Sequence, residues 1–232
     1  MQDRAPNCIV RGAVPKYAPV LVGRPGRPLL WRFGGDHRFV FVLWLLLMPK
    51  KILLLTDDSG ESLEIYYAQH RFREAGYRVL IASTRRKRLH GVLHDFDPDW
   101  ATYVEKPGYR IQSDLSFRQV RPADYEAALL IGGRAPEFLR HNPTVLRIIR
   151  DFHRLGKWIF SICHGIQILA AAGLIRGRTV TCYRHVRLEV EQGGGRWVDR
   201  ESVVDRPARL ITSQTWESHP DFYRDIFRHL RP

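Results

Sequence analysis

The sequence predicts an α/β fold in which a mainly parallel sheet is covered by helices on both faces. From Lys50 onward, short apolar runs alternate with longer segments whose apolar residues recur every three or four positions, the order typical of strand–helix–strand units. The apolar runs are continuous, as expected of strands buried on both faces. Several of the longer segments end at a glycine, which commonly follows the last turn of a helix.

The predicted elements follow one another along the chain. KKILLLT, residues 50–56, is the first buried strand, and the helical segment 61–75 after it is followed by Gly76. Further strands are expected at residues 77–83, 126–133, 157–162, 178–183 and 208–213. Further helices are expected at residues 143–155, 165–172 and about 220–230. Residues 84–118 interrupt the alternation and are expected to form a hairpin or a flap.

The first 47 residues differ from the rest of the chain. Residues 1–38 are rich in Arg, Gly and Pro without a helical or strand period, which is typical of disorder. The apolar run FVFVLWLLLM, residues 39–48, is too short to span a bilayer, which takes about 20 residues. A basic segment before a short apolar run resembles a secretory signal, but no small-residue cleavage site follows. We expect Met48 to be the true start, residues 1–47 to be an over-extended gene model or disordered, and residues 48–232 to form one domain; a membrane signal is the alternative.

The composition favours a globular protein of a reducing compartment. Of the 232 residues, 44% are hydrophobic, so the chain can bury a substantial core. Three scattered cysteines do not form a disulfide framework, and this favours a cytoplasmic location. The formal net charge is +13, but the basic residues are spread along the chain rather than gathered in one stripe. We therefore expect neither a nucleic-acid nor a membrane partner.

Four segments that are distant in the sequence are expected to meet at one edge of the sheet. Each lies at the carboxyl end of a predicted strand. The four segments are residues 57–64, 132–137, 163–164 and 213–219. Ligands of open α/β sheets bind beyond the carboxyl ends of the strands. This edge is therefore the predicted functional site.

Cys163 lies where a strand is predicted to turn sharply into a helix. In Ser161-Ile162-Cys163-His164-Gly165, small residues stand two positions before and after the cysteine, as they do in a nucleophile elbow. The helix N-terminus would stabilise a thiolate. The backbone N–H groups of His164 and Gly133 would stabilise an oxyanion. The alternatives are that Cys163 is a small buried apolar side chain or a metal ligand.

Three residues are candidates for the acid/base partner of Cys163. Glu64 would stay protonated beside a thiolate and donate a hydrogen bond to it. The alternative is that Glu64 is an ordinary exposed carboxylate in the first turn of a helix, where the helix dipole stabilises it. His164 is adjacent, but neighbouring side chains at a tight turn usually diverge, so we expect its ring to point elsewhere. His219, two residues before Asp221, would complete a Cys/His/Asp triad or simply begin the last helix.

We expect no metal and no cofactor. His90, His94, Asp95 and Asp97 form a possible ligand cluster, but a polar loop is the simpler interpretation because they lie in the interrupting segment. No phosphate-loop or dinucleotide-binding glycine pattern is present.

Three segments resemble the ThiJ/PfpI superfamily, also called the DJ-one superfamily. They are GGRAPEFL (132–139), SICHGIQILAAAGLIRGR (161–178) and EKPGYRI (105–111). The resemblance runs from about Lys50 to the C-terminus, and it is greatest to the PfpI-type intracellular peptidases (peptidase family C56) and the plant DJ-one-type glyoxalases. It implies a flavodoxin-like three-layer α/β/α sandwich, which agrees with the pattern of strands and helices.

The resemblance also implies roles for individual residues. Cys163 would be the nucleophile, Glu64 the carboxyl paired with it, and His164 the histidine of a proposed triad. Glu137 would enter the site of an adjacent subunit, so we expect at least a homodimer. The plant glyoxalases carry two such domains per chain, whereas this sequence has one.

Three functions are compatible with these residues. The first, which we favour, is a glutathione-independent glyoxalase of the glyoxalase III type that converts methylglyoxal-like 2-oxoaldehydes to hydroxy acids through a Cys163 thiohemiacetal. Trp216 and His219 would line its pocket. The second is a PfpI-type cysteine peptidase acting on peptides. The third is a non-enzymatic stress-response protein in which Cys163 senses oxidants. A glutamine amidotransferase, related in fold, is a weaker alternative because Asp221 stands where that class has Glu.

Overall fold

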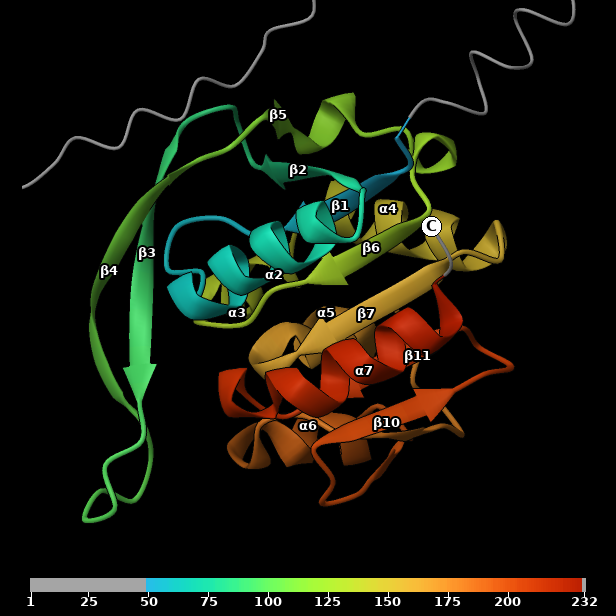
Figure 1. Cartoon of the computed structure of the whole chain (residues 1–232). Helices are drawn as coiled ribbons and strands as arrows, with labels where there is room; N and C mark the ends of the chain where they lie inside the picture. Colours follow the sequence, from blue (N-terminus) through green and yellow to red (C-terminus); the bar gives the residue numbers. More distant parts are fainter. Residues whose placement is uncertain (1–48, 231–232) are drawn as a thin grey trace, which may run out of the picture. The chain divides into compact units, whose positions relative to one another are not determined.

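A seven-stranded sheet organises the computed structural model, which describes residues 49–230 (Figure 1). The strand order is β10-β11-β7-β6-β1-β2-β5. The strands are β1 Lys51–Leu55, β2 Arg78–Ser83, β5 Leu115–Ser116, β6 Ala127–Leu130, β7 Trp158–Ile162, β10 Ser202–Asp205 and β11 Leu210–Ser213. All neighbours are parallel except β10 and β11, which are antiparallel. The predicted mainly parallel sheet is confirmed.

Helices cover both faces of this sheet. They are α2 Ser62–Glu74, α3 Ala135–Leu139, α4 Pro143–Arg154, α5 Ile166–Ala171, α6 Arg187–Gln192 and α7 His219–His229. The chain moves from β1 to β2 in one direction and from β6 through β7 to β11 in the other. Right-handed connections therefore place α2 on one face and α4 and α5 on the opposite face. Helix α7 shares the face of α2, where the rings of Phe72 and Tyr223 lie 5.5 Å apart.

Local sequence signals set the helix ends. Asn142 accepts the backbone N–H of Thr144 at 2.9 Å, and Pro143 occupies the first turn of α4, both of which favour a helix start. Gly156, in the left-handed region at φ +63, follows the end of the same helix. Between the helix layers, the strands are fully buried, with Ile52, Leu53 and their neighbours 0% exposed.

The interrupting segment contains a long antiparallel hairpin, as the sequence predicted. It consists of β3 Arg88–Asp95 and β4 Val104–Gln112, paired with a register shift between His90 and Val92. Figure 1 shows this hairpin standing beside the main sheet rather than within it. It touches the start of α2, because Ser62 Oγ accepts the backbone N–H of Tyr109 at 3.1 Å.

The structure departs from the predicted elements in several places, among them α6, β5 and β9 Arg196–Trp197, which were not predicted. Of the predicted strand 178–183, only β8 Thr179–Val180 is extended, and it pairs with β9 outside the main sheet. The short helix α3 and the antiparallel edge strand β10 were not predicted, since neither is long enough to show a clear period. The predictions for residues 1–47 lie outside the described residues. Among residues 49–230, no helix is both long and apolar enough to cross a bilayer.

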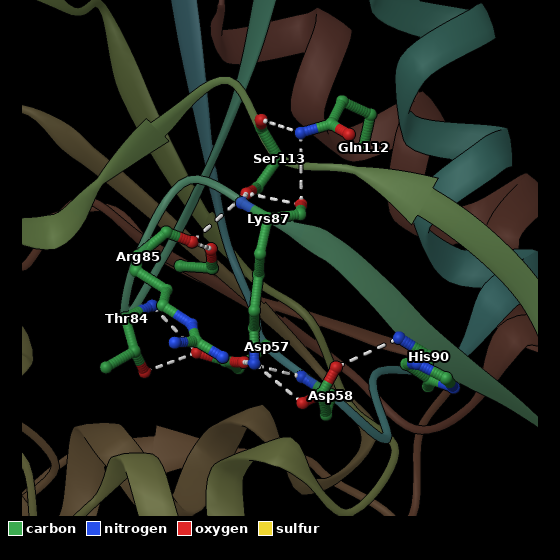
Figure 2. Close-up of polar contacts among 9 residues, drawn as sticks. Asp57, Asp58, Thr84, Arg85, Lys87, His90, Gln112 and Ser113 are labelled. Atoms are coloured by element: carbon green, nitrogen blue, oxygen red, sulfur yellow. Dashed lines mark hydrogen bonds and ion pairs between the residues drawn. The ribbon is translucent and has the colours of Figure 1, made fainter.

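An ion-pair cluster holds the loop that leads from β1 into α2 (Figure 2). Lys87 Nζ lies 2.7 Å from Asp57 Oδ1 and 2.6 Å from Asp58 Oδ2. Asp57 also accepts the backbone N–H of Thr84 at 2.7 Å, and Asp58 accepts that of His90 at 2.9 Å. Thr84, Lys87 and His90 belong to the β2–β3 connection and the start of the hairpin. The cluster therefore fixes the position from which α2 and its first turn begin.

Candidate active site

The site lies where the strand order of the sheet reverses. From β1 the chain goes to β2 on one side, and it later returns to β6 on the other side. A crevice at such a reversal is the usual ligand site of an open parallel sheet. The loop after β1 and the loop after β6 meet there through an antiparallel bridge between Gly60 and Gly133. The neighbouring strand β7 ends at Ile162, directly before Cys163.

Cys163 occupies a sharp turn at the end of β7. Its φ is +57, a left-handed conformation that is strained for a residue with a side chain. A Cβ on Gly165 would lie 2.6 Å from the carbonyl oxygen of Leu130, so a glycine is required for the turn to pack against β6. The backbone N–H groups of Gly133 and His164 bond to the sulfur. The arrangement is the predicted elbow, with two donors that converge on the reactive atom.

Glu64 meets this sulfur from the first turn of α2. Its side chain is 1% exposed, and its Oε2 accepts the backbone N–H of Gly132 at 2.6 Å. A Cβ on Gly132 would lie 2.5 Å from the Cβ of Cys163 and 2.9 Å from Glu64 Oε2. Burial, followed by the charge of Glu61, holds the pKa of Glu64 well above its usual value. Both effects favour the protonated form of the carboxyl.

The thiol differs from the prediction of an intrinsically acidic cysteine. Burial, followed by the charge of Glu64, raises the pKa of Cys163 well above its usual value, and the N–H groups of Gly133 and His164 offset only part of this. The helix behind the elbow starts at Ile166 and is only six residues long, so its dipole is weak. When Glu64 is protonated, its contribution to the thiol pKa disappears. Burial by itself still raises the pKa of the thiol, so the thiolate is a minor form at neutral pH.

Glu61 is a site residue that the sequence analysis missed. It caps α2, is 0% exposed, and its Oε2 accepts the backbone N–H of Glu64 at 2.7 Å. Burial raises its pKa to about 7. Helices are usually capped by Ser, Thr, Asp or Asn rather than Glu, so no local sequence signal marked this residue as a buried cap. Its charge acts on both Glu64 and Cys163.

The ring of His164 lies beside the sulfur, contrary to the expectation that it would point elsewhere. Its Nδ1 is 3.2 Å from Cys163 Sγ. The ring is packed among aromatic side chains, with centroids 5.7 Å from Tyr103 and 5.2 Å from Tyr183. These contacts hold the imidazole against the turn, and the positive φ of Cys163 brings the two side chains together. Burial, with a smaller contribution from His94, lowers the pKa of His164 to about 4, so this ring is neutral at pH 7.

The hairpin supplies a polar network behind this ring. His94, 1% exposed, stacks on Tyr103 at 3.8 Å, and its Nε2 lies 3.0 Å from Glu105 Oε2. Arg134 bonds both oxygens of Glu105, at 2.6 and 2.8 Å. His94 had been considered only as a weak metal candidate, and it contacts Glu105 instead. Within residues 49–230, no group of three or more His, Cys, Asp or Glu side chains is placed to hold a metal ion.

The remaining predicted site residues lie apart from the sulfur. Glu137 is exposed in the first turn of α3 and forms no side-chain hydrogen bond within the described residues. Trp216 donates its Nε1–H to the carbonyl of His94 at 2.8 Å, so it supports the hairpin. His219 is buried and stacks on Tyr67 at 4.4 Å. The predicted pairing of His219 with Asp221 is not formed, because Asp221 bonds Arg224.

A cleft of about 290 Å³ lies next to the packed rings around His164. It shares Tyr183 with them, and the hairpin residues Phe96 and Trp100 form part of its wall. Asp97, Glu201 and Glu217 bring carboxylates to its lining, and Arg184 and His185 bring basic groups. Trp216 does not line this cleft, although Glu217 beside it does. The cleft is large enough for a small organic molecule.

A known protein family matches most of this chain. The DJ-1/PfpI family matches residues 50–229. Protein DJ-1 homolog D of Arabidopsis thaliana is 38% identical over 183 residues, which are 76% of this chain and 47% of the relative. Deglycase TK1284 of Thermococcus kodakarensis is 39% identical over 155 residues, which are 67% of this chain and 85% of the relative. The chain thus spans about half the length of the Arabidopsis protein.

The solved structure of a ThiJ/PfpI domain protein from Brachyspira murdochii supports the fold. It superposes with a TM-score of 0.67 at 21% identity and covers 77% of this chain and 95% of its own. At that identity the likeness concerns the fold alone. The family match over most of the described residues and the 39% identity to the Thermococcus protein are stronger evidence of family membership than the structural likeness. The chain therefore belongs to the DJ-1/PfpI family.

Proposed function

We propose that this protein is a glutathione-independent glyoxalase that converts methylglyoxal and similar small 2-oxoaldehydes to 2-hydroxy acids. The observation that carries the proposal is that the buried carboxyl of Glu64 and the thiol of Cys163 face the same point, since a Cβ on Gly132 would lie 2.9 Å from Glu64 Oε2 and 3.1 Å from Cys163 Sγ. A carboxyl in that position lies next to any carbon to which the sulfur adds. It can therefore move a proton between that carbon and its neighbour.

The first step is addition of the sulfur to the aldehyde. In the minor form of the site that holds a thiolate beside a protonated Glu64, the Cys163 sulfur attacks the aldehyde carbon and Glu64 gives its proton to the aldehyde oxygen, which forms a neutral thiohemiacetal and a Glu64 carboxylate. While charge develops on that oxygen, the backbone N–H groups of Gly133 and His164 stabilise it. The neutral His164 ring, 3.2 Å from the sulfur, keeps water away from one side of the thiolate.

The second step is a proton transfer between two carbons. The Glu64 carboxylate takes the hydrogen from the former aldehyde carbon, and the electron pair of that bond forms an enediolate. Glu64 then returns the proton to the second carbon, and the hydroxyl proton of the first carbon moves to the second oxygen. The product is a thioester of a 2-hydroxy acid. The first carbon has been oxidised and the second reduced, so no external oxidant is needed.

Hydrolysis then completes the cycle. Water attacks the thioester, the sulfur leaves, and the released thiol proton returns to the Glu64 carboxylate. The site is again a thiolate beside a protonated carboxyl, and the hydroxy acid loses its own proton to solvent. The raised pKa of Glu64 suits this task, since the carboxyl must accept and return a proton near neutral pH.

The burial of the thiol favours a small substrate over a polypeptide. Cys163 is only 4% exposed, and a peptidase would need an open groove above it. A peptidase of the Cys/His type also uses an imidazole that becomes charged. The pKa of His164, lowered to about 4 by burial, opposes that role.

A deglycase that removes aldehyde adducts from amines is the second candidate. The Thermococcus relative bears the name deglycase. The cleft beside Tyr183 supports it, because the carboxylates of Asp97, Glu201 and Glu217 would receive an amino or guanidinium group attached to the aldehyde carbons. The same thiol and carboxyl would perform the chemistry. The two candidates differ in whether free methylglyoxal or its arginine adduct is the better substrate.

Methylglyoxal consumption without glutathione tests the proposal. The full chain is compared with Cys163→Ala, Glu64→Gln and, as a control thiol, Cys182→Ala, and the hydroxy acid is identified by NMR. We expect no turnover in Cys163→Ala, a loss of about 10²-fold or more in kcat for Glu64→Gln, and nearly full activity in Cys182→Ala. The arginine adduct and casein are assayed in parallel. Turnover that survives in Cys163→Ala, or full activity in Glu64→Gln, would refute the mechanism.

A further inference from the structure

Four arginines that are separated in the sequence line one cleft at the β10 end of the main sheet. They are Arg178, Arg196, Arg200 and Arg206, and the cleft has a volume of about 610 Å³. We call it the arginine cleft. Its floor includes β10, the edge strand of the main sheet. The cleft shares no lining residue with the one beside Tyr183.

The charge of this cleft is not balanced by acidic groups. Asp205 is the one carboxylate among the lining residues. It is already engaged, because Oδ2 lies 3.5 Å from Arg178 Nη1 and Oδ1 accepts the backbone N–H of Ala208 at 3.0 Å. Arg196 is oriented by the hydroxyl of Thr179, at 3.2 and 2.9 Å. Four guanidinium groups around one occupied carboxylate give the cleft a positive potential, which attracts anions.

Two of the four arginines are free to receive such an anion. The side chains of Arg200 and Arg206 are exposed and form no hydrogen bond or ion pair with the described part of the chain. By contrast, many of the exposed arginines on the helices pair with a carboxylate three or four positions away, as Arg224 does with Asp221. Guanidinium groups bind phosphate oxygens with two parallel hydrogen bonds.

The spacing of these groups favours a chain of phosphates over a single one. Arg200 and Arg206 lie on either side of the four residues of β10, which span about 13 Å at about 3.3 Å per residue. One phosphate cannot contact both ends of such a span. Successive phosphates of one nucleic-acid strand, with one charge per about 3.4 Å in a duplex, extend over it.

We propose that the arginine cleft binds the phosphodiester backbone of a single-stranded nucleic acid along β10. Arg200 and Arg206 lie on either side of β10 in the sequence, and Arg178 and Arg196 line the same cleft. Binding there is sequence-independent, because it uses phosphates rather than base edges. It is also independent of the chemistry proposed at Cys163. The inference opposes the expectation from sequence that no nucleic acid binds, which rested on the scatter of basic residues along the chain.

Binding of a fluorescent 20-nucleotide oligothymidylate to the full chain tests this inference. Affinity is measured by anisotropy over a series of salt concentrations, for the unmodified chain and for the double variant Arg200→Ala/Arg206→Ala. The control is Arg73→Ala/Arg121→Ala, which removes the same charge from two exposed arginines away from the cleft. Cys163→Ala is included to separate binding from the site chemistry.

We expect micromolar or weaker affinity, in the range of about 10⁻⁴ to 10⁻⁶ M typical of non-specific binding. The cleft variant should bind at least about tenfold more weakly. Its plot of log affinity against log salt should be shallower by about 1.4, since each lost phosphate contact contributes about 0.7 for a single strand. The control pair and Cys163→Ala should bind as the unmodified chain does.

Three results would overturn the inference. They are no binding of the oligonucleotide, equal weakening by the cleft and control variants, and equally tight binding of poly-glutamate at the same charge. The second would show that net charge rather than the cleft is responsible. Tripolyphosphate serves as a competitor, and displacement of the oligonucleotide by it, lost in the cleft variant, would support phosphate recognition.

Discussion

The backbone N–H of Glu64 donates a hydrogen bond of 2.7 Å to Oε2 of Glu61, so the residue that caps helix α2 also faces the carboxyl paired with Cys163. Glu61 is fully buried, and burial raises its pKa to about 7. Its ionisation therefore takes place within the physiological range. Because its charge raises the pKa of Glu64 and of Cys163, the protonation state of the cap is coupled to that of the site.

Replacement of Glu61 by Gln should remove a pH dependence of stability. In the unfolded chain this carboxyl ionises near its ordinary value of 4.5, whereas in the folded chain it ionises at about 7. As pH rises through this window, the unfolded chain loses the proton first. The folded state of the unmodified chain thus becomes less stable, by up to about 3 kcal/mol above pH 7. Glu61→Gln keeps the capping oxygen and should show no such loss.

Urea denaturation at pH 5 and pH 8 measures this difference. The control is Glu74→Gln, at the other end of α2, where the side chain is 74% exposed and pairs with Arg71. It should leave the pH dependence unchanged. In activity assays, Glu61→Gln should also move the pH profile of kcat/KM toward lower pH, since it removes a charge that raises the pKa of Glu64. If Glu61→Gln changed neither the pH profile of kcat/KM nor the pH dependence of stability, Glu61 would be neutral over the whole range from pH 5 to pH 8.

A methyl group on Gly132 should disrupt the site. The added Cβ would lie 2.5 Å from the Cβ of Cys163 and 2.9 Å from Glu64 Oε2, so the elbow or the helix must move. We expect Gly132→Ala to lose about 2 kcal/mol or more of stability and at least about 10²-fold in kcat. Gly156→Ala is the control, because nothing lies within 4 Å of its Cβ, and it should cost only about 1 kcal/mol through its positive φ. Thermal unfolding and methylglyoxal turnover provide the two readouts.

Loss of Lys87 should destabilise the loop before α2. Burial raises the pKa of Asp57, but the Lys87 ion pair and the Thr84 hydrogen bonds outweigh it, so the net pKa is lowered. In Lys87→Met the carboxylate of Asp57, which is 2% exposed, would remain without its cation. We expect this to lower the free energy of unfolding by about 2 kcal/mol, after allowance for the partial exposure of the lysine. Lys106→Met is the matched control, since its pair with Asp95 is exposed and its loss should leave the free energy of unfolding nearly unchanged.

The pH dependence of this pair has the opposite sign to that of Glu61. A lowered folded-state pKa means that the stabilisation by Asp57 is present above the unfolded value of 3.8 and is lost as pH falls through the folded value. Chemical denaturation between pH 3 and 7 should therefore show a steeper acid loss for the unmodified chain than for Lys87→Met. Parallel curves for the two proteins would contradict a native ion pair at this position.

Glu137 should act on the site of a neighbouring subunit. It is exposed and unpaired within the described residues, but its charge acts on Tyr103, a ring that packs against His164. We expect Glu137→Gln and Cys163→Ala each to be inactive. A mixture that exchanges subunits should regain up to about a quarter of full activity, because half of the dimers then contain one intact site. Light scattering establishes the oligomer, and a mixture that stays inactive despite subunit exchange would place Glu137 outside the neighbouring site.

Much of the fold follows from local sequence patterns. The continuous apolar runs and the helical spacing between them predicted β1, β2, β6, β7 and β11 and helices α2, α4, α5 and α7 to within a few residues. Short-range signals sufficed because each element is defined by its own period and by caps such as Asn142 and Gly156. The sharp turn at Cys163 was also predictable, since the small residues at 161 and 165 are needed locally for it to pack.

Other features depend on contacts between distant residues. The orientation of the His164 ring is decided by Tyr103 and Tyr183, and the acidity of Glu61 is decided by how deeply the cap is buried. In the same way, the four guanidinium groups of the arginine cleft come together only when β8, β9 and β10 are in place. A residue's sequence neighbours specify its backbone conformation, whereas its burial and charge environment are set by whatever the fold packs against it. For this reason the sequence by itself determined the architecture and the candidate nucleophile, and only the tertiary structure decided the protonation of the site and the grouping of its charges.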